Sequence, residues 1–169
     1  MNYTLINGDL LESDAKYICH QCNCITTSSS GIAAAIFNKF PYSNIYTHRE
    51  SYFIDQLPLE GEQPGDIVIK GNGKDERYII NMMGQLYPGG IKYQNSTKDG
   101  ELARQRFFKD CLLKIMKIED LESIAFPFKI GCGLADGNWD IYEKLIDTFA
   151  KVMNNKNVKT YIYKYDENI

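Results

Sequence analysis

Short apolar stretches bounded by turn residues recur along the chain and predict the strands of a β-sheet. Two of these stretches are separated by an Asn-Gly step at residues 72–73, which is a strong short-range signal for a β-hairpin. The predicted strands cover residues 3–6, 17–22, 66–70, 77–83, 123–127 and 160–163.

Apolar residues at helical spacing predict helices between these strands. Pro41 ends the first helix, Ser43 caps the second and Asn138 caps the last. The helical segment and stripes are residues 32–40; Ile45, Tyr52 and Phe53; Phe108, Cys111, Leu112 and Ile115; and Tyr142, Leu145, Ile146 and Phe149. Strands that alternate with helices predict a single α/β domain over residues 1–169, with three α/β/α layers around a mixed, mostly parallel sheet of about six strands.

The overall composition, with 44% hydrophobic and 24% charged residues, is that of a globular protein and excludes a disordered or fibrous chain. No apolar run approaches the roughly 18 residues of a membrane span, and the first residues lack an export signal. We therefore expect a cytoplasmic protein without a membrane partner. A net charge of −3 and scattered lysines also argue against a nucleic-acid partner.

Five cysteines, an odd number, indicate free thiols in a reducing compartment. Cys19, Cys22 and Cys24 lie close together with His20 between them, which would suit a metal or redox site. However, side chains of a strand alternate between its two faces, so these donors do not all converge on one ion. We therefore expect buried, unreactive thiols with no metal and no cofactor. A metal content of zero in the purified protein would exclude the alternative.

Residues 17–40 place a strand, a Ser/Thr/Gly loop and a helix in direct succession. The first turn of a helix leaves backbone N–H groups without acceptors and carries the positive end of the helix dipole, so it favours a bound phosphate. Ser28, Ser29 and Ser30 supply hydroxyls there, and Gly31 lets a ligand approach the backbone closely. The alternative is that the serines serve only as a helix cap.

A second glycine loop at residues 131–137 follows one predicted strand and precedes the last helix. Ligands of α/β sheets bind beyond the carboxyl ends of the strands, where both loops are expected to lie. Two such loops suit a diphosphate. Residues 84–97 show neither a helical nor an alternating pattern, and a loop of that length in a compact domain is usually functional.

The chain resembles the macrodomains, a family of α/β/α domains that bind ADP-ribose. The matching segments are residues 7–10, 18–24, 30–33, 40–41 and 127–135, and together they follow the family pattern over essentially the whole chain. The resemblance is closer to the branch that includes phage and yeast proteins processing ADP-ribose 1″-phosphate and the terminal ADP-ribose glycohydrolases. It implies ADP-ribose or a derivative as the partner, with an ADP-ribosylated macromolecule as a further candidate.

The resemblance also implies roles for residues at the matching positions. Asp9, beside Leu10, would accept a hydrogen bond from the adenine amino group; the alternative is a turn aspartate that caps the next segment. Asn23 would bond the distal ribose, and Tyr163 would stack on adenine or else pack within its strand. The diphosphate would be held by Ser30, Gly31, Ile32, Gly131, Cys132, Gly133, Leu134, Ala135 and Gly137.

Hydrolysis of an ADP-ribose derivative is the activity that the resemblance implies, either of the 1″-phosphate, which is the leading candidate, or of an ADP-ribosyl linkage. Asp136 is the expected general base, and His20 would shuttle a proton if its end of the strand faces the cleft. The alternative for His20 is a hydrogen-bonded residue of the core. Cys132 is a weaker candidate, as a nucleophile.

Several positions depart from the family pattern. Thr26 and Ser29 stand where relatives usually have glycine, and Ala135 stands where the glycohydrolases carry an aspartate. Gln85 aligns with the lysine nucleophile of those glycohydrolases, and an amide does not form the covalent sugar adduct. Gln85 and the altered first loop favour the alternative function, a reader that binds ADP-ribose or ADP-ribosylated targets without turnover.

Overall fold

The computed structural model describes residues 1–49, 61–91 and 98–165. They contain a six-stranded sheet in the order β1-β6-β5-β2-β4-β3. Neighbouring strands are parallel except β3 and β4, which form the predicted antiparallel hairpin. The strands are β1 Thr4–Asn7, β2 Tyr17–Asn23, β3 Ile67–Lys70, β4 Tyr78–Gln85, β5 Ser123–Pro127 and β6 Lys159–Lys164.

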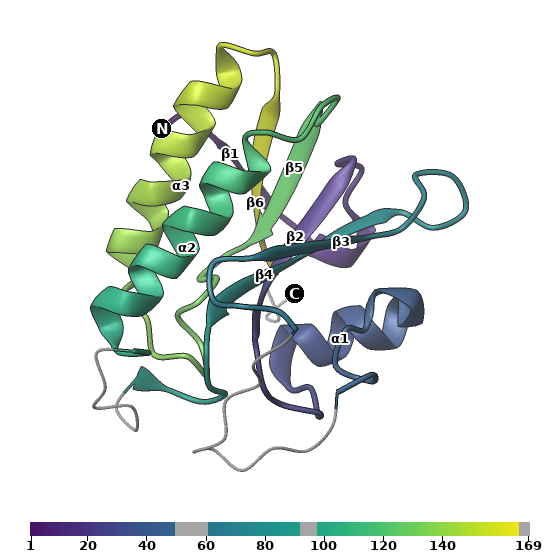
Figure 1. Ribbon diagram of the computed structural model, residues 1–169. Helices are drawn as coiled ribbons and strands as arrows, with labels where there is room; N and C mark the ends of the chain where they lie inside the picture. Colours follow the sequence, from purple (N-terminus) through teal and green to yellow (C-terminus); the bar gives the residue numbers. More distant parts are fainter. Residues whose placement is uncertain (50–60, 92–97, 166–169) are drawn as a thin grey trace.

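Helices cover both faces of this sheet, which confirms the predicted three-layer α/β/α architecture (Figure 1). Helix α1, Gly31–Lys39, lies on one face, while α2, Glu101–Ile115, packs beside α3, Trp139–Asn154, on the other. Two short 3-10 helices are η1, Leu10–Glu12, and η2, Pro41–Ser43. Within the described ranges, no helix has both the length and the apolar character needed to cross a membrane.

The central strand β2 is buried on both faces because an apolar layer packs against each side of the sheet. Cys19 belongs to the layer under α2 and α3, whereas Cys22 and Cys24 belong to the layer under α1. The alternation of side chains along the strand thus separates the thiols. In the described parts of the chain, no cluster of His, Cys, Asp and Glu is arranged to hold a metal ion.

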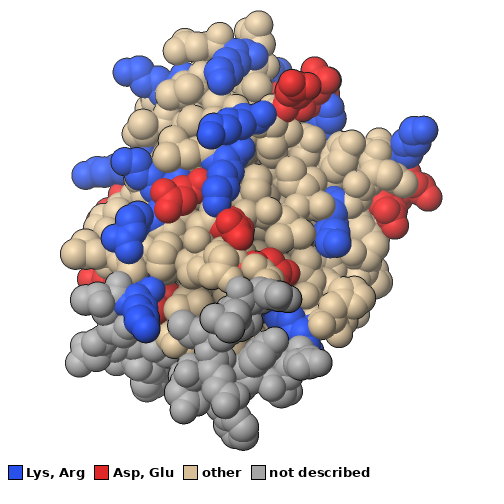
Figure 2. Space-filling model, in the orientation of Figure 1, with Lys and Arg blue, Asp and Glu red and all other residues tan. Residues whose placement is uncertain are grey.

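The predicted stripes of the two long helices face the core, as their spacing requires. In α2 all four residues of the stripe are buried. In α3 the stripe is buried except Leu145, which is half-buried at its edge. The outer surface of both helices carries lysine, arginine and acidic side chains in mixture, as seen on the face in Figure 2.

The chain after α1 corrects the prediction of a second helix. Ser43 ends η2 instead of capping a helix. The following residues continue as turns, because the side chain of Asn44 accepts a hydrogen bond from the backbone N–H of Tyr46 at 2.9 Å. This turn places Tyr46 in the core. The remaining members of the predicted stripe, Tyr52 and Phe53, lie outside the described residues.

Strand β4 is longer than predicted and includes Gly84 and Gln85. The pattern-free loop expected at residues 84–97 therefore begins two residues later, and its residues 92–97 fall outside the described ranges. The glycine fits this position because a Cβ on Gly84 would lie 2.3 Å from the side-chain oxygen of Gln21 on the neighbouring strand. The end of β4 thus packs closely against the end of β2.

Candidate functional site

A pocket of about 1230 Å³ opens at the edge of the sheet where the parallel strands end. Its walls come from η1, the loop before α1, the end of β4, the loop after β5 and the end of β6. This is the edge at which the sequence predicts a ligand. Predicted site residues that line the pocket are Asp9, Leu10, Asn23, Ser30, Gly31, Ile32, Gly131, Gly133, Leu134, Ala135, Asp136 and Tyr163.

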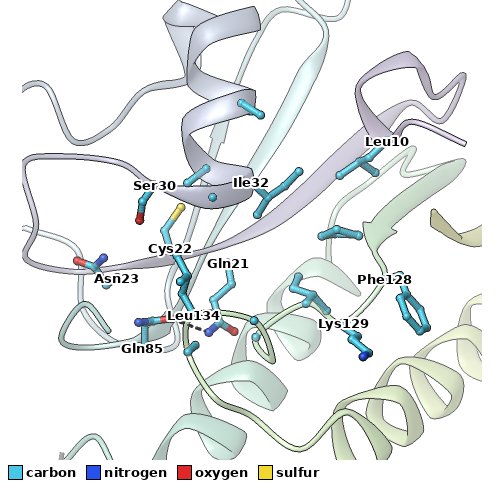
Figure 3. A pocket seen from close by; sticks show the side chains of 18 of the residues that line it. Leu10, Gln21, Cys22, Asn23, Ser30, Ile32, Gln85, Phe128, Lys129 and Leu134 are labelled. Atoms are coloured by element: carbon cyan, nitrogen blue, oxygen red, sulfur yellow. Dashed lines mark hydrogen bonds between the residues drawn. The ribbon is translucent and has the colours of Figure 1, made fainter. Parts of the chain in front are cut away.

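Asn23 shapes the chain where β2 ends and the first loop begins. Its side-chain oxygen accepts hydrogen bonds from the backbone N–H groups of Ile25 at 3.0 Å and Thr26 at 2.8 Å. Its own backbone N–H donates to the hydroxyl of Tyr46 at 3.0 Å. Figure 3 shows Asn23 and Gln85 toward one end of the pocket, which we call the distal end.

The N-terminus of α1 is open toward the pocket. Ser30 occupies the N-cap position, yet its side chain makes no capping hydrogen bond. The alternative role of these serines, a helix cap, is therefore not seen at the N-cap position, and the first-turn N–H groups keep their capacity to bind an anion. Gly31 has a φ of +59°, a left-handed conformation that favours glycine.

The loop after β5, Phe128 to Gly137, is held tightly by its own backbone hydrogen bonds. The N–H of Asp136 donates to the carbonyl of Gly133 at 3.1 Å, and the N–H of Gly137 donates to the carbonyl of Gly131 at 3.0 Å. The two loops also approach one another, since a Cβ on Gly31 would lie 3.5 Å from the side chain of Leu134. Backbone from two different elements therefore borders one cavity.

Two predicted ligand residues of this loop do not line the pocket, namely Cys132 and Gly137. A Cβ on Gly137 would lie 2.4 Å from the carbonyl oxygen of Gly131, so this glycine is needed for the close packing of the loop. The thiol of Cys132 lies 3.3 Å from the carbonyl of Ile130, and burial raises its pKa to about 12. A protonated thiol away from the cavity is a poor nucleophile.

His20 also lies away from the pocket, so the condition for a proton-shuttling role, an end of the strand that faces the cleft, is not met. The ring is fully buried, with Nε2 2.6 Å from the side-chain oxygen of Asn81 and its plane edge-on to Phe37. Burial lowers the pKa of His20 to about 4, so the ring is neutral at pH 7. The residue is a hydrogen-bonded part of the core under α1, and we assign it no proton-transfer role.

The opposite end of the pocket is marked by Leu10 and Phe128 in Figure 3. Asp9 precedes Leu10 in the chain and the carbonyl of Tyr163 accepts from the N–H of Phe128 at 2.8 Å, so both pocket residues lie toward this end. A carboxylate oxygen of Asp9 accepts a hydrogen bond from the N–H of Leu11 at 3.0 Å and so caps η1. The turn role expected as an alternative is therefore present, and the same side chain still lines the cavity. A carboxylate has two acceptor oxygens, so Asp9 can cap η1 and also accept a hydrogen bond from a donor group of a ligand.

A match to a known protein family accounts for this three-layer fold with a pocket at the ends of the parallel strands. The family model of the Macro domain matches residues 19–146. The chain belongs to the macrodomain family. A protein of Enterobacteria phage T4, described as an uncharacterized 17.5 kDa protein in the tk-vs intergenic region, is 28% identical over an alignment of 155 positions. The alignment covers 86% of this chain and 88% of the phage protein.

Solved macrodomains share the fold at low sequence identity. The macrodomain of Mycobacterium tuberculosis DarG has a TM-score of 0.67 at 19% identity, with 95% of this chain and 96% of that chain covered. A Trypanosoma brucei macrodomain solved in complex with ADP-ribose has a TM-score of 0.63 at 14% identity, covering 99% of this chain and 65% of that chain. Both solved structures therefore share the three-layer fold of this chain.

Several residues of the macrodomain pocket escaped the sequence analysis. Gln21 comes from a strand that is otherwise buried, and its amide donates to the side-chain oxygen of Gln85 at 2.8 Å (Figure 3). Tyr46 enters from the turns after α1, where a helix is wrongly predicted. Lys129 and Lys164 lie near the ring of Phe128, at 5.7 and 4.9 Å from its centre. Among these residues, only Gln21 could have been found from the sequence, because it is a polar residue near the end of an otherwise apolar strand.

Proposed function

We propose that this macrodomain binds ADP-ribose in the pocket and hydrolyses an ADP-ribose derivative there, with ADP-ribose 1″-phosphate as the leading candidate. The observation that carries the proposal is the pair of backbone loops at one cavity, an uncapped helix N-terminus at Gly31 and the loop at Gly131 to Asp136. A diphosphate needs hydrogen-bond donors on several oxygens, and backbone N–H groups supply them without reorganisation.

The bound ligand would run from one end of the pocket to the other. Asp9 and Tyr163 would receive the adenine, the first as an acceptor for its amino group and the second as a stacking surface. Asn23 and Asp136 would border the distal ribose. This direction follows the family resemblance, and the relative solved with ADP-ribose from T. brucei supports the choice of ligand.

Asp136 would act as the general base. A water would attack the phosphorus of the 1″-phosphate while the Asp136 carboxylate accepts its proton. That proton would then pass to the sugar oxygen as its bond to phosphorus breaks, which leaves ADP-ribose and inorganic phosphate. The N–H groups of the loops would hold the ligand in place for this attack. Asp136 is exposed to the cavity, so a water reaches it.

The second candidate function is a reader that binds ADP-ribose or ADP-ribosylated targets without turnover. Gln85 favours it, because both ends of this amide are already hydrogen-bonded. Its nitrogen donates to the carbonyl of Tyr87 at 2.9 Å, and its oxygen accepts from Gln21. An amide so held neither attacks a sugar nor transfers a proton.

Calorimetric titration with ADP-ribose tests the shared part of both functions. Micromolar binding is expected, and an Asp9→Ser variant should bind about tenfold or more weakly, a loss of about 1.4 kcal/mol. Serine retains the cap of η1, so the loss reports the missing carboxylate. Asp14→Ser is the matched control, because Asp14 is exposed and does not line the pocket. No detectable binding by the wild-type protein would refute the proposal.

A phosphate-release assay with ADP-ribose 1″-phosphate separates the enzyme from the reader. Asp136→Asn should lower kcat by about two orders of magnitude, the usual contribution of a general base. Asp140→Asn, three residues beyond the loop end and outside the pocket lining, should leave the rate unchanged. A wild-type protein that binds ADP-ribose but releases neither phosphate from ADP-ribose 1″-phosphate nor ADP-ribose from ADP-ribosylated protein would be the reader.

A further inference from the structure

A buried ion pair lies directly behind the distal end of the pocket. Arg104, on the first turns of α2, and Asp99, just before that helix, are 1% and 0% exposed, with Nη2 2.7 Å from Oδ2. Neither side chain lines the cavity. Burial of a charge pair costs desolvation energy, so the pair by itself is weak evidence for a stabilising role. Its role is therefore inferred from the groups to which it is hydrogen-bonded.

The pair is hydrogen-bonded to the backbone of residues 86–90, the segment after β4, which we call the distal wall of the pocket. The two carboxylate oxygens of Asp99 accept from the N–H groups of Leu86 at 2.7 Å and Tyr87 at 2.9 Å. The guanidinium of Arg104 donates to the carbonyls of Tyr87 at 3.2 Å and Gly89 at 2.8 Å. The ion pair thereby holds the N–H groups of Leu86 and Tyr87 and the carbonyls of Tyr87 and Gly89. The amide of Gln85 shares these two carbonyls.

The same guanidinium reaches the opposite loop. Nη1 of Arg104 also donates to the carbonyl of Ala135 at 3.4 Å, the residue immediately before Asp136. Asp136 itself has a φ of +61°, a left-handed conformation that is uncommon outside glycine and that aspartate tolerates better than most residues. Arg104 therefore joins the wall after β4 to the segment that carries the proposed general base.

Gly90, which follows Gly89 in the distal wall, lies against the side chain of Asp136. A Cβ on Gly90 would lie 1.9 Å from a carboxylate oxygen of Asp136, so the carboxylate rests against the bare backbone of this glycine. The preceding carbonyl, that of Gly89, is the one that Arg104 holds most closely. The position of the Asp136 carboxylate is thus bounded by two backbone segments bonded to one guanidinium.

We infer that Arg104, with Asp99 as its counter-ion, is a positioning residue that sets the place of Asp136 and of the distal wall. The inference rests on the proposed function, since it concerns the same pocket. Arginine suits the task because its planar fork offers five donors in fixed directions, whereas lysine offers one rotating ammonium group. An Arg104→Lys variant would keep the charge beside Asp99 but lose most of the carbonyl contacts.

The test compares two ligands in wild type, Arg104→Lys and Arg106→Lys. AMP lacks the distal ribose and the second phosphate, so it reports the adenine end alone. Arg104→Lys should weaken ADP-ribose binding by about tenfold or more while AMP binding stays within about twofold. Arg106, exposed on the same helix, is the matched control, and its substitution should change neither affinity.

In a folded Arg104→Lys protein, equal weakening of ADP-ribose and AMP binding, or an unchanged affinity for both, would overturn the inference. In either case, a wild-type protein that binds ADP-ribose retains the ligand that the proposed function requires. If wild type binds neither ligand, the proposed function itself fails.

A second variant keeps the inference falsifiable if Arg104→Lys does not fold. Gly90→Ala adds one methyl group where the Asp136 carboxylate rests, and that carboxylate, at the end of a side chain, is the group that moves. For ADP-ribose 1″-phosphate, kcat should fall by about tenfold or more while KM stays within about twofold. An unchanged kcat in a folded Gly90→Ala protein would overturn the role assigned to this contact.

Discussion

A neutral imidazole is enclosed near the centre of the sheet, and its setting affects stability. The ring of His20 is held by Asn81 and covered by Phe37 from α1, with no exposure to water. Burial disfavours the charged form and lowers the pKa of His20 to about 4, against 6.5 for an ordinary histidine. Between these two values the unfolded chain binds a proton that the folded chain does not.

Stability should therefore fall as the pH falls from 6.5 toward 4, by roughly 3 kcal/mol once the pH is below both values. Urea unfolding measured across this range checks the slope. A His20→Gln variant retains hydrogen-bonding capacity toward Asn81 but does not titrate, so its slope should be clearly smaller. His48→Gln, at an exposed position, is the matched control. Equal slopes in wild type and His20→Gln would contradict this account.

At the scale of elements, two helices begin at the same edge of the sheet with different N-termini. In α3, the side chain of Asn138 accepts a hydrogen bond from the N–H of Asp140 at 3.0 Å. In α1, Ser30 makes no such bond. A helix that leaves its N-terminus uncapped forgoes stability, and this pocket-lining helix is the one where an anion would supply the missing acceptor.

Removal of the two caps should therefore have unequal consequences. Asn138→Ala should cost about 1 kcal/mol of unfolding free energy, because the cap bond is lost. Ser30→Ala should change that free energy by less than about 0.5 kcal/mol. Urea denaturation of both variants beside wild type measures the difference. If Ser30→Ala proves as costly as Asn138→Ala, the serine caps α1 in solution and the anion site is already filled.

The elements with regular periodicity could be predicted, and those shaped by one side chain could not. The stripes of α2 and α3 repeat over several turns, so many residues agree on one answer. The segment after α1 begins a predicted helical stripe at Ile45. In the structure, a hydrogen bond from the N–H of Tyr46 to the side chain of Asn44 forms a turn there instead. The extra length of β4 likewise depends on the packing of Gly84 against Gln21.

At the scale of the whole molecule, the pocket draws residues from five strand ends and from both sides of the sheet. A ligand there contacts the domain as a unit, so its binding energy should stabilise the entire fold. At a free ADP-ribose concentration about 100 times Kd, the unfolding free energy should rise by about 2.7 kcal/mol. Denaturant unfolding with and without ligand provides the measurement.

The same experiment examines the expectation of a single domain over residues 1–169. One cooperative transition that shifts as a whole with ADP-ribose is the expected result. The Asp9→Ser variant, with its weaker binding, should show a smaller shift at the same ligand concentration. Two separate transitions, of which the ligand moves only one, would show that the chain contains two independent folding units.

The sequence by itself determined the layers, the strand order along the chain and the two loops at the pocket, because these depend on local periodicity and turn chemistry. The tertiary structure alone decided which side chains reach the cavity. His20 lies within a predicted strand and Asp136 in the loop that follows another, yet one is enclosed under α1 and the other faces the pocket. The pairing of Asp99 and Arg104 with the backbone of residues 86–89 and Ala135 arises only where separate segments meet, and no local pattern specifies such long-range contacts.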